Sequence, residues 1–199
     1  MSQGSEQPAL IRPTIHHFGV ITAHLEETLD WYAKVLGMTT VVQPSHGLVF
    51  LSNDRAHHRL AVLSLPVTAN PDARPHAKLQ HVAFEYATLD DLLTSWERLK
   101  DLGIEPVLAA DHGPTTAFYY QDPDGNSIEV FVDNFGDWEQ SSHSLRTSPE
   151  FAANPMGTFV DPEQMLVAHK AGATAAELHQ RAMAGSFAPT RPMNPRVLL

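Results

Sequence analysis

The sequence predicts an α+β fold of two βαβββ modules, followed by a helical and irregular C-terminal extension. Three observations predict it. The first two thirds of the chain contain an internal repeat, and each copy alternates between strand-like and helix-like apolar periodicity. After Asp133 the repeat stops and the composition changes, which marks the start of the extension.

The repeat pairs His17-Phe-Gly-Val with His81-Val-Ala-Phe, which begins 64 residues later. With this offset Leu25 falls on Leu89, and each copy then reaches a Leu-Gly pair. A repeat of this length indicates one supersecondary unit used twice.

The first module is assigned to residues 14–66. Apolar residues at 25, 29, 32, 35 and 36 have the spacing of one helical face, and Gly37 is a helix stop. Short apolar runs predict the strands of this module at about 14–21, 38–42, 48–52 and 60–65.

The second module is assigned to residues 78–133, with a helix at about 90–102. Its strands are expected near 79–86, 104–109, 115–121 and 127–132. Asp122-Pro-Asp-Gly-Asn joins the last two strands as a turn, because proline fixes one φ and glycine accepts the positive φ of a hairpin.

Three further segments lie outside the modules. Residues 1–13 form a polar arm, and residues 67–77, rich in Pro, Asp and Ala, form a linker. The Pro-rich extension, residues 134–199, is expected to hold two short helices. One starts at Asp161-Pro162, and the other at the capping box Thr174-Ala-Ala-Glu177.

Composition excludes several classes of protein. A net charge of −10 with no Lys/Arg cluster disfavours nucleic acid and anionic membranes as partners. The absence of cysteine excludes disulfides, thiol nucleophiles and thiolate metal sites. Neither an export signal nor an apolar run of about 20 residues is present, so we expect a cytoplasmic protein without a membrane span.

Strand parity brings three polar side chains to one face. Because side chains alternate along a strand, His17, His81 and Glu129 each point away from the apolar face that would pack on the helices. Glu129 lies in the middle of Ile-Glu-Val-Phe-Val, where an unpaired buried carboxylate would cost several kcal/mol. Each residue alone is more often a solvated or satisfied side chain, but their coincidence with the repeat favours a site.

Two imidazoles and one carboxylate form the facial triad that suits non-haem Fe(II), with positions left open for substrate and oxygen. The same donors can bind zinc, so the ligand types alone do not choose the metal.

The quoted motifs, together with Asp122-Pro-Asp-Gly-Asn-Ser-Ile-Glu129, resemble the vicinal oxygen chelate (glyoxalase-like) superfamily over about residues 14–133. That resemblance implies a cupped mixed sheet of paired βαβββ modules around a metal held by His17, His81 and Glu129.

The stretch from Asp111 to Glu129 is similar to the type I extradiol dioxygenases. The resemblance implies that Tyr119, ten residues before Glu129, lines the pocket, and that His112 is an acid/base histidine. Glyoxalase-type enzymes use a fourth protein ligand, but Ala61 occupies the position that matches Glu129. The resemblance therefore implies an Fe(II) enzyme, with Mn(II) as the alternative ion, that opens a small aromatic diol with O₂.

Two alternatives remain open at this point. One is a divalent-metal-dependent isomerase, epimerase or lyase of the same superfamily, and the other is a metal-free module that binds small molecules, of the drug-resistance type. His57-His58 could rim the pocket or lie in solvent, and the extension could cover the pocket mouth or embrace a neighbouring subunit. We expect a homo-oligomer.

Overall fold

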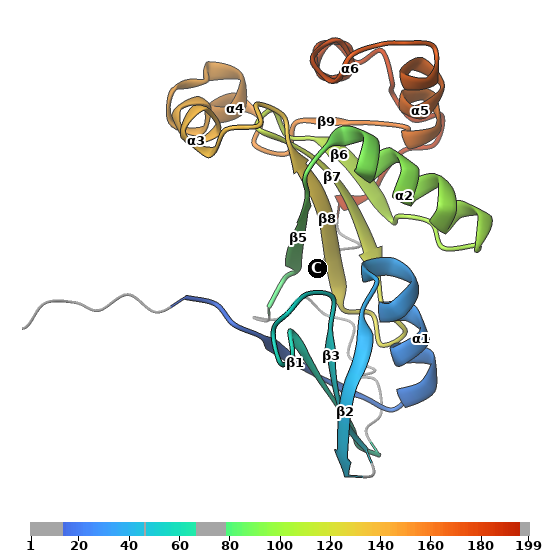
Figure 1. Ribbon diagram of the computed structural model, residues 1–199. Coiled ribbons are helices and arrows are strands. Elements are labelled where there is room, and N and C mark those ends of the chain that lie inside the picture. The colour runs from blue at the N-terminus through green and yellow to red at the C-terminus, as the bar shows by residue number, and fades with distance from the viewer. Residues whose placement is uncertain (1–13, 46, 67–78, 196–199) are drawn as a thin grey trace, which may run out of the picture.

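The computed structural model describes residues 14–45, 47–66 and 79–195 (Figure 1). The polar arm and the linker therefore lie outside the described residues. The first module contains β1 (Phe18–Thr22), α1 (Leu25–Leu36), β2 (Thr39–Ser45), β3 (Leu48–Ser52) and β4 (Leu60–Ser64). The second contains β5 (Val82–Tyr86), α2 (Leu89–Asp101), β6 (Leu108–Asp111), β7 (Thr115–Gln121) and β8 (Ser127–Asp133).

The two modules repeat one topology, which confirms the predicted α+β fold. The first sheet has the order β1-β4-β3-β2 and the second β5-β8-β7-β6-β9. In each module the first strand pairs in parallel with the last, in the same register: Gly19 is opposite Ala61, and Ala83 is opposite Glu129. The structure therefore places Ala61 and Glu129 at equivalent positions.

A hydrophobic core joins the two modules. Helices α1 and α2 lie on the same side of the sheets (Figure 1), and their buried apolar residues belong to one cluster. The modules meet where the rings of Phe18 in β1 and Phe84 in β5 lie 6.0 Å apart. The buried Tyr32 hydroxyl of α1 donates to Asp122 in the β7–β8 turn, at 3.2 Å.

The extension is more ordered than the sequence predicts. Its elements are α3 (Trp138–Thr147), α4 (Pro149–Ala153), β9 (Thr158–Phe159), α5 (Pro162–Lys170) and α6 (Ala175–Met183). The two predicted helices are α5 and α6, and α6 has the predicted capping box. The expectation of only two helices in the extension is wrong, because α3 and α4 are also present. Only Ser141 is buried in α3 and no residue in α4, so neither helix has an apolar stripe to predict it.

Three strands begin later than predicted, at Phe18, Val82 and Leu108. The parallel partner of β1 starts only at Leu60, so the residues before Phe18 have no strand to pair with. The bounds of α1, β3 and β7 agree with the prediction. None of the helices in the described ranges is both long and apolar enough to cross a membrane.

Candidate active site

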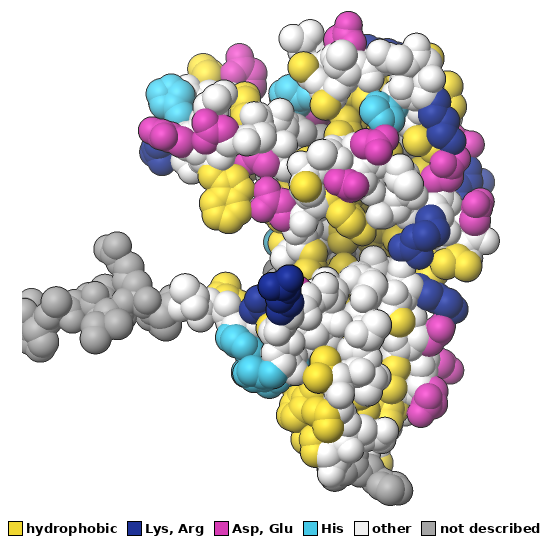
Figure 2. Space-filling model, in the orientation of Figure 1, with side chains coloured by type: hydrophobic (Ala, Val, Ile, Leu, Met, Phe, Trp, Pro, Cys, Tyr) yellow, Lys and Arg dark blue, Asp and Glu magenta, His cyan; other side chains and the backbone are white. Residues whose placement is uncertain are grey.

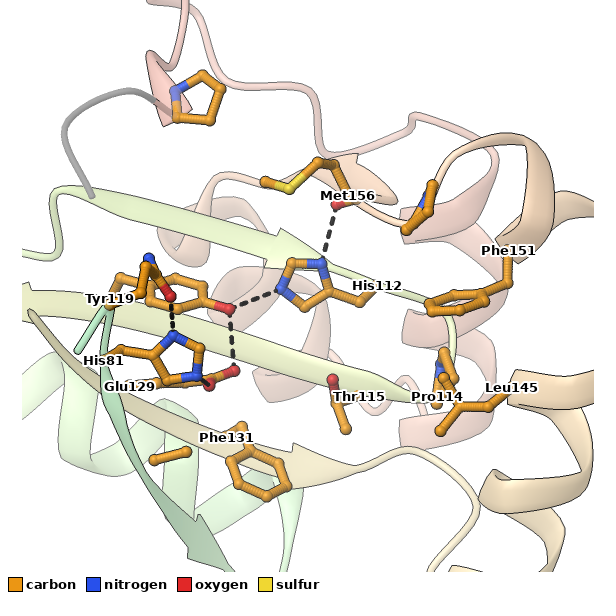
Figure 3. A pocket seen from close by; sticks show the side chains of 14 residues that line it. His81, His112, Pro114, Thr115, Tyr119, Glu129, Phe131, Leu145, Phe151 and Met156 are labelled. Carbon is orange, nitrogen blue, oxygen red and sulfur yellow. Dashed lines mark hydrogen bonds and ion pairs between the residues drawn. The ribbon is translucent and has the colours of Figure 1, made fainter. Parts of the chain in front are cut away.

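A cavity of about 910 Å³ opens on the face of the second sheet that is turned away from α1 and α2. The space-filling view shows a hollow beneath the lobe formed by α3 and α4 (Figure 2). The walls of the cavity come from the second module and from the extension. Its polar side chains include His81, His112, Tyr119 and Glu129, all four of which the sequence singles out (Figure 3).

Glu129 is the buried acid of this cavity. It lies in β8 with 8% of its surface exposed, between Ile128 and Val130, which pack into the core. Its Oε2 is 2.9 Å from Nε2 of His81, and its Oε1 accepts a hydrogen bond from the Tyr119 hydroxyl at 3.0 Å. His81 and Glu129 therefore share one face, as strand parity predicts, and Tyr119 lies on the same face.

Gln80 orients the imidazole of His81. The side-chain oxygen of Gln80 accepts a hydrogen bond from Nδ1 of His81, which turns Nε2 toward Glu129. A partner on the second ring nitrogen fixes the tautomer and the ring orientation of metal-binding histidines. Sequence reasoning missed Gln80, although its place directly before a candidate ligand was a usable signal.

Tyr119 and His112 extend the network from Glu129 across the cavity. Nε2 of His112 is 3.1 Å from the Tyr119 hydroxyl, and Nδ1 of His112 donates to the carbonyl oxygen of Met156 at 2.9 Å. A carbonyl oxygen can only accept, so Nδ1 carries a proton and Nε2 is the position that can exchange one. Burial first, and the Glu129 charge second, raise the pKa of Tyr119, which keeps its phenol neutral and able to donate.

The extension completes the cavity. It contributes apolar side chains that the sequence did not single out: Leu145, Phe151, Pro155, Met156 and Pro195. The extension therefore forms part of the cavity wall, and the expectation that it covers the pocket mouth stays a prediction. These residues had no repeat partner and no apolar period, so sequence reasoning had no signal for them.

Gly157 lets the extension approach His112 closely. Its φ of 65° lies in the left-handed region, and a Cβ added there would lie 2.6 Å from the Cα of His112 and nearer still to the Asp111 carbonyl oxygen. The next residue, Thr158, pairs with Asp111 in the sheet. Asp111, fully buried, also contacts Nδ1 of His179 in α6 at 2.7 Å. The backbone around His112 is thus fixed by the extension on two sides.

His17 does not join this network in the structure. Its ring is exposed and lies beside His16 and His58 at the edge of the first module. In the described part of the chain, three potential metal-ligand atoms from His, Asp or Glu side chains lie within 4.8 Å of one another only at His16, His17 and His58. A second cavity, of about 380 Å³, lies between β1 and the start of β5 and is lined by both Phe18 and His81. The assignment of His17 as the third metal ligand stays a prediction.

Known proteins resemble this chain in sequence and in fold. Biphenyl-2,3-diol 1,2-dioxygenase 2 of Rhodococcus globerulus is 38% identical over 187 residues, which cover 94% of this chain and 97% of the relative. Biphenyl-2,3-diol 1,2-dioxygenase 3 of the same organism is 37% identical over 175 residues, which cover 87% of this chain and 91% of the relative.

A crystal structure of a glyoxalase/dioxygenase from Nostoc punctiforme shares the fold, with a TM-score of 0.52 and 18% identity. The match covers 64% of this chain and 99% of that structure. Residues 14–130, which cover the first module and all but the last three residues of the second, match the model of the Glyoxalase/Bleomycin resistance protein/Dioxygenase superfamily. The chain belongs to the Glyoxalase/Bleomycin resistance protein/Dioxygenase superfamily.

Proposed function

We propose that this chain is an Fe(II)-dependent extradiol dioxygenase that opens a catechol-type diol beside its hydroxyl groups. One diol and one O₂ would give one ring-opened semialdehyde acid, so both oxygen atoms enter the product. The observation that supports this most is the continuous line of polar contacts from His81 through Glu129 and Tyr119 to His112, in a cavity that is otherwise mostly apolar. The two relatives of R. globerulus are named for this kind of reaction.

The donors on the cavity wall fit a divalent cation. The Glu129 carboxylate is buried next to His81, whose Nε2 faces it while Nδ1 is occupied by Gln80. In the proposal these two residues and His17 hold Fe(II), with Mn(II) as an alternative for the same donors. Bound there, the ion would supply a Lewis-acidic centre with open positions for the diol and O₂.

The protein's own proton chemistry is assigned to His112 and Tyr119. Nε2 of His112 faces the cavity and can take a proton from a diol hydroxyl, then return it to a product oxygen. The Met156 carbonyl holds Nδ1–H throughout, so the exchange is confined to one nitrogen. Tyr119, kept neutral by its raised pKa, donates a hydrogen bond that it can shift from Glu129 to a substrate oxygen.

The size and lining of the cavity favour a diol with a second ring. At about 910 Å³ the cavity is near the upper end of ordinary ligand pockets. Phe151 and Leu145 of the extension offer apolar surface on the side away from Glu129 (Figure 3). We therefore propose a 2,3-dihydroxybiphenyl-like substrate, with its diol at Glu129 and its outer ring against the extension.

The test is oxygen uptake by the chain after anaerobic loading with Fe(II). Catechol, 3-methylcatechol and 2,3-dihydroxybiphenyl are compared, and Glu129→Gln serves as the inactive control. A yellow product with one O₂ consumed per diol supports the proposal. Turnover of an aldehyde–thiol adduct or an epimerisable acid without O₂ would replace the dioxygenase proposal with the isomerase alternative. Binding of a diol without any turnover would replace it with the metal-free binding module. A homo-oligomer and a cytoplasmic location stay predictions.

A further inference from the structure

Four histidines gather at one edge of the first module, outside the cavity. They come from two pairs, His16-His17 before β1 and His57-His58 before β4. Because β1 and β4 run parallel with Phe18 opposite Leu60, the residues that precede both strands lie side by side. Histidine side chains are visible at this edge, beside the start of the described chain (Figure 2).

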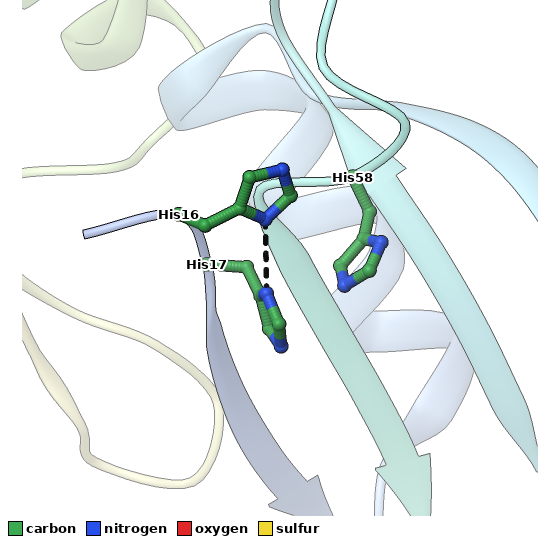
Figure 4. Close-up of side chains that lie close together, drawn as sticks. All are labelled: His16, His17 and His58. Atoms are coloured by element: carbon green, nitrogen blue, oxygen red, sulfur yellow. Dashed lines mark hydrogen bonds between the residues drawn. The ribbon is translucent and has the colours of Figure 1, made fainter. Parts of the chain in front are cut away.

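Three of these imidazoles, those of His16, His17 and His58, converge (Figure 4). The two Nδ1 atoms of His16 and His17 are 3.0 Å apart, and one ligand atom from each of the three residues lies within 4.8 Å of the others. Nitrogen ligands of one tetrahedral zinc ion, each about 2.0–2.1 Å from it, lie about 3.4 Å apart, so a small rotation of these side chains brings the three nitrogens to the spacing of a zinc site. The ring of Phe50 stacks on His58 at 4.6 Å between centroids and holds that imidazole toward the other two.

We propose that His16, His17 and His58 form a second, histidine-only site for a divalent transition-metal ion, with Zn²⁺ as the best fit. Three imidazoles form a donor set that suits zinc, and the exposure of His16 and His17 leaves a fourth position for water. Nitrogen donors bind Zn²⁺ more tightly than Fe²⁺, so the site would select against the ion proposed for the cavity. The neighbouring cation, Arg59, is paired with Asp54 at 2.8 Å, which offsets its repulsion of an ion.

The two metal sites compete for His17. This consequence rests on the proposed function, in which His17 also completes the iron site with His81 and Glu129. A Zn²⁺ ion bound by His16 and His58 keeps His17 at the edge of the first module, away from the cavity. Zinc would then inhibit the enzyme by withdrawing one iron ligand, while the diol pocket stays free.

The binding test uses the full chain, stripped of metal by a chelator, and Zn²⁺ alone. Calorimetric titration of Glu129→Ala, in which the cavity carboxylate is removed, should still give one tight Zn²⁺ per chain. Adding His58→Ala should weaken this affinity at least tenfold, whereas adding His143→Ala, an exposed histidine in α3, should leave it unchanged. The absorption spectrum of bound Co²⁺ should show nitrogen ligands in Glu129→Ala and lose that signature when His58→Ala is added.

A His58→Ala affinity no lower than that of His143→Ala, or loss of all tight Zn²⁺ binding in Glu129→Ala alone, would overturn the site. The inhibition test then adds Zn²⁺ to the iron-loaded wild-type chain and to His58→Ala. Relief of inhibition in His58→Ala supports the competition, and equal inhibition in both overturns it. The calorimetric result decides the zinc site even if the chain cleaves no diol.

Discussion

The two modules share one topology but differ in what each carries on the face away from the helices. In the second module, this face holds Tyr119 and Glu129, both buried beneath the extension. In the first, the equivalent face holds Ala61, and its neighbours Ile21 and Leu63 are exposed. The repeat thus supplies a scaffold, and the chemistry depends on residues placed in one copy and on the segment that covers it.

The largest expected effect comes from removing the acid that distinguishes the modules. Glu129→Ala should abolish iron binding and reduce kcat/KM by more than the ~10–100-fold that loss of an outer partner of a metal ligand costs. Iron content and oxygen uptake measure both effects. Adding Ala61→Glu, which puts a carboxylate at the same register position of the first module, should restore neither. Recovery in the double variant would show that the two modules are interchangeable as metal carriers.

The second-largest effect is expected where the extension closely approaches His112. Gly157→Ala should lower kcat by about 100-fold and change its pH dependence, because a displacement of about 1 Å at a catalytic group can cost that much. Gly136→Ala is the matched control: its φ is 64° against 65°, but a Cβ there meets no atom within 4 Å. Both variants should lose about 1–3 kcal/mol of stability from backbone strain, and Gly157→Ala should lose more because its Cβ meets main-chain atoms. Equal kcat values in the two variants would show that the extension covers His112 without positioning it.

The sequence predicted the parts of the site that follow from local periodicity. Strand parity put His81 and Glu129 on the face opposite the apolar residues that pack on the helices, because side chains alternate along a strand whatever the tertiary fold. The contribution of Met156 could not be predicted, since it depends on a main-chain carbonyl that reaches His112 from 44 residues away. The same limit applies to His17: the pattern predicts its face from strand alternation, but its distance from His81 depends on how the two modules pack, and the structure has it just before β1.

The apolar part of the cavity should control which diol is preferred. Phe151→Ala removes a ring of the extension that faces the cavity, and should raise KM for 2,3-dihydroxybiphenyl about tenfold, given ~1.5–3 kcal/mol for burying such a side chain. KM for catechol, which has no second ring, should change little. Phe135→Ala, outside this cavity, is the control and should alter neither value. A parallel rise of KM for both diols would place the outer ring elsewhere.

The smallest effect concerns the contact that joins the modules. Burial first, and the nearby Asp122 carboxylate second, raise the pKa of Tyr32, whose hydroxyl donates to Asp122. A tyrosine whose pKa is higher in the folded chain stabilises it fully below the unfolded value of about 10 and loses this contribution as pH rises above it. Tyr32→Phe should therefore cost about 1.5–3 kcal/mol at pH 8, the range for a hydrogen bond to a charged group.

At pH 11 the difference between Tyr32→Phe and the wild type should shrink, because only the wild-type chain gains an ionised Tyr32 on unfolding. Urea unfolding of both chains at the two pH values measures the change. The hydrogen bond that Tyr32→Phe removes links α1 of the first module to the β7–β8 turn of the second. Its loss should therefore lower the stability of the chain with little change in kcat. A gap that stays constant from pH 8 to pH 11 would mean that the Tyr32 hydroxyl is not held neutral by its buried place between the modules.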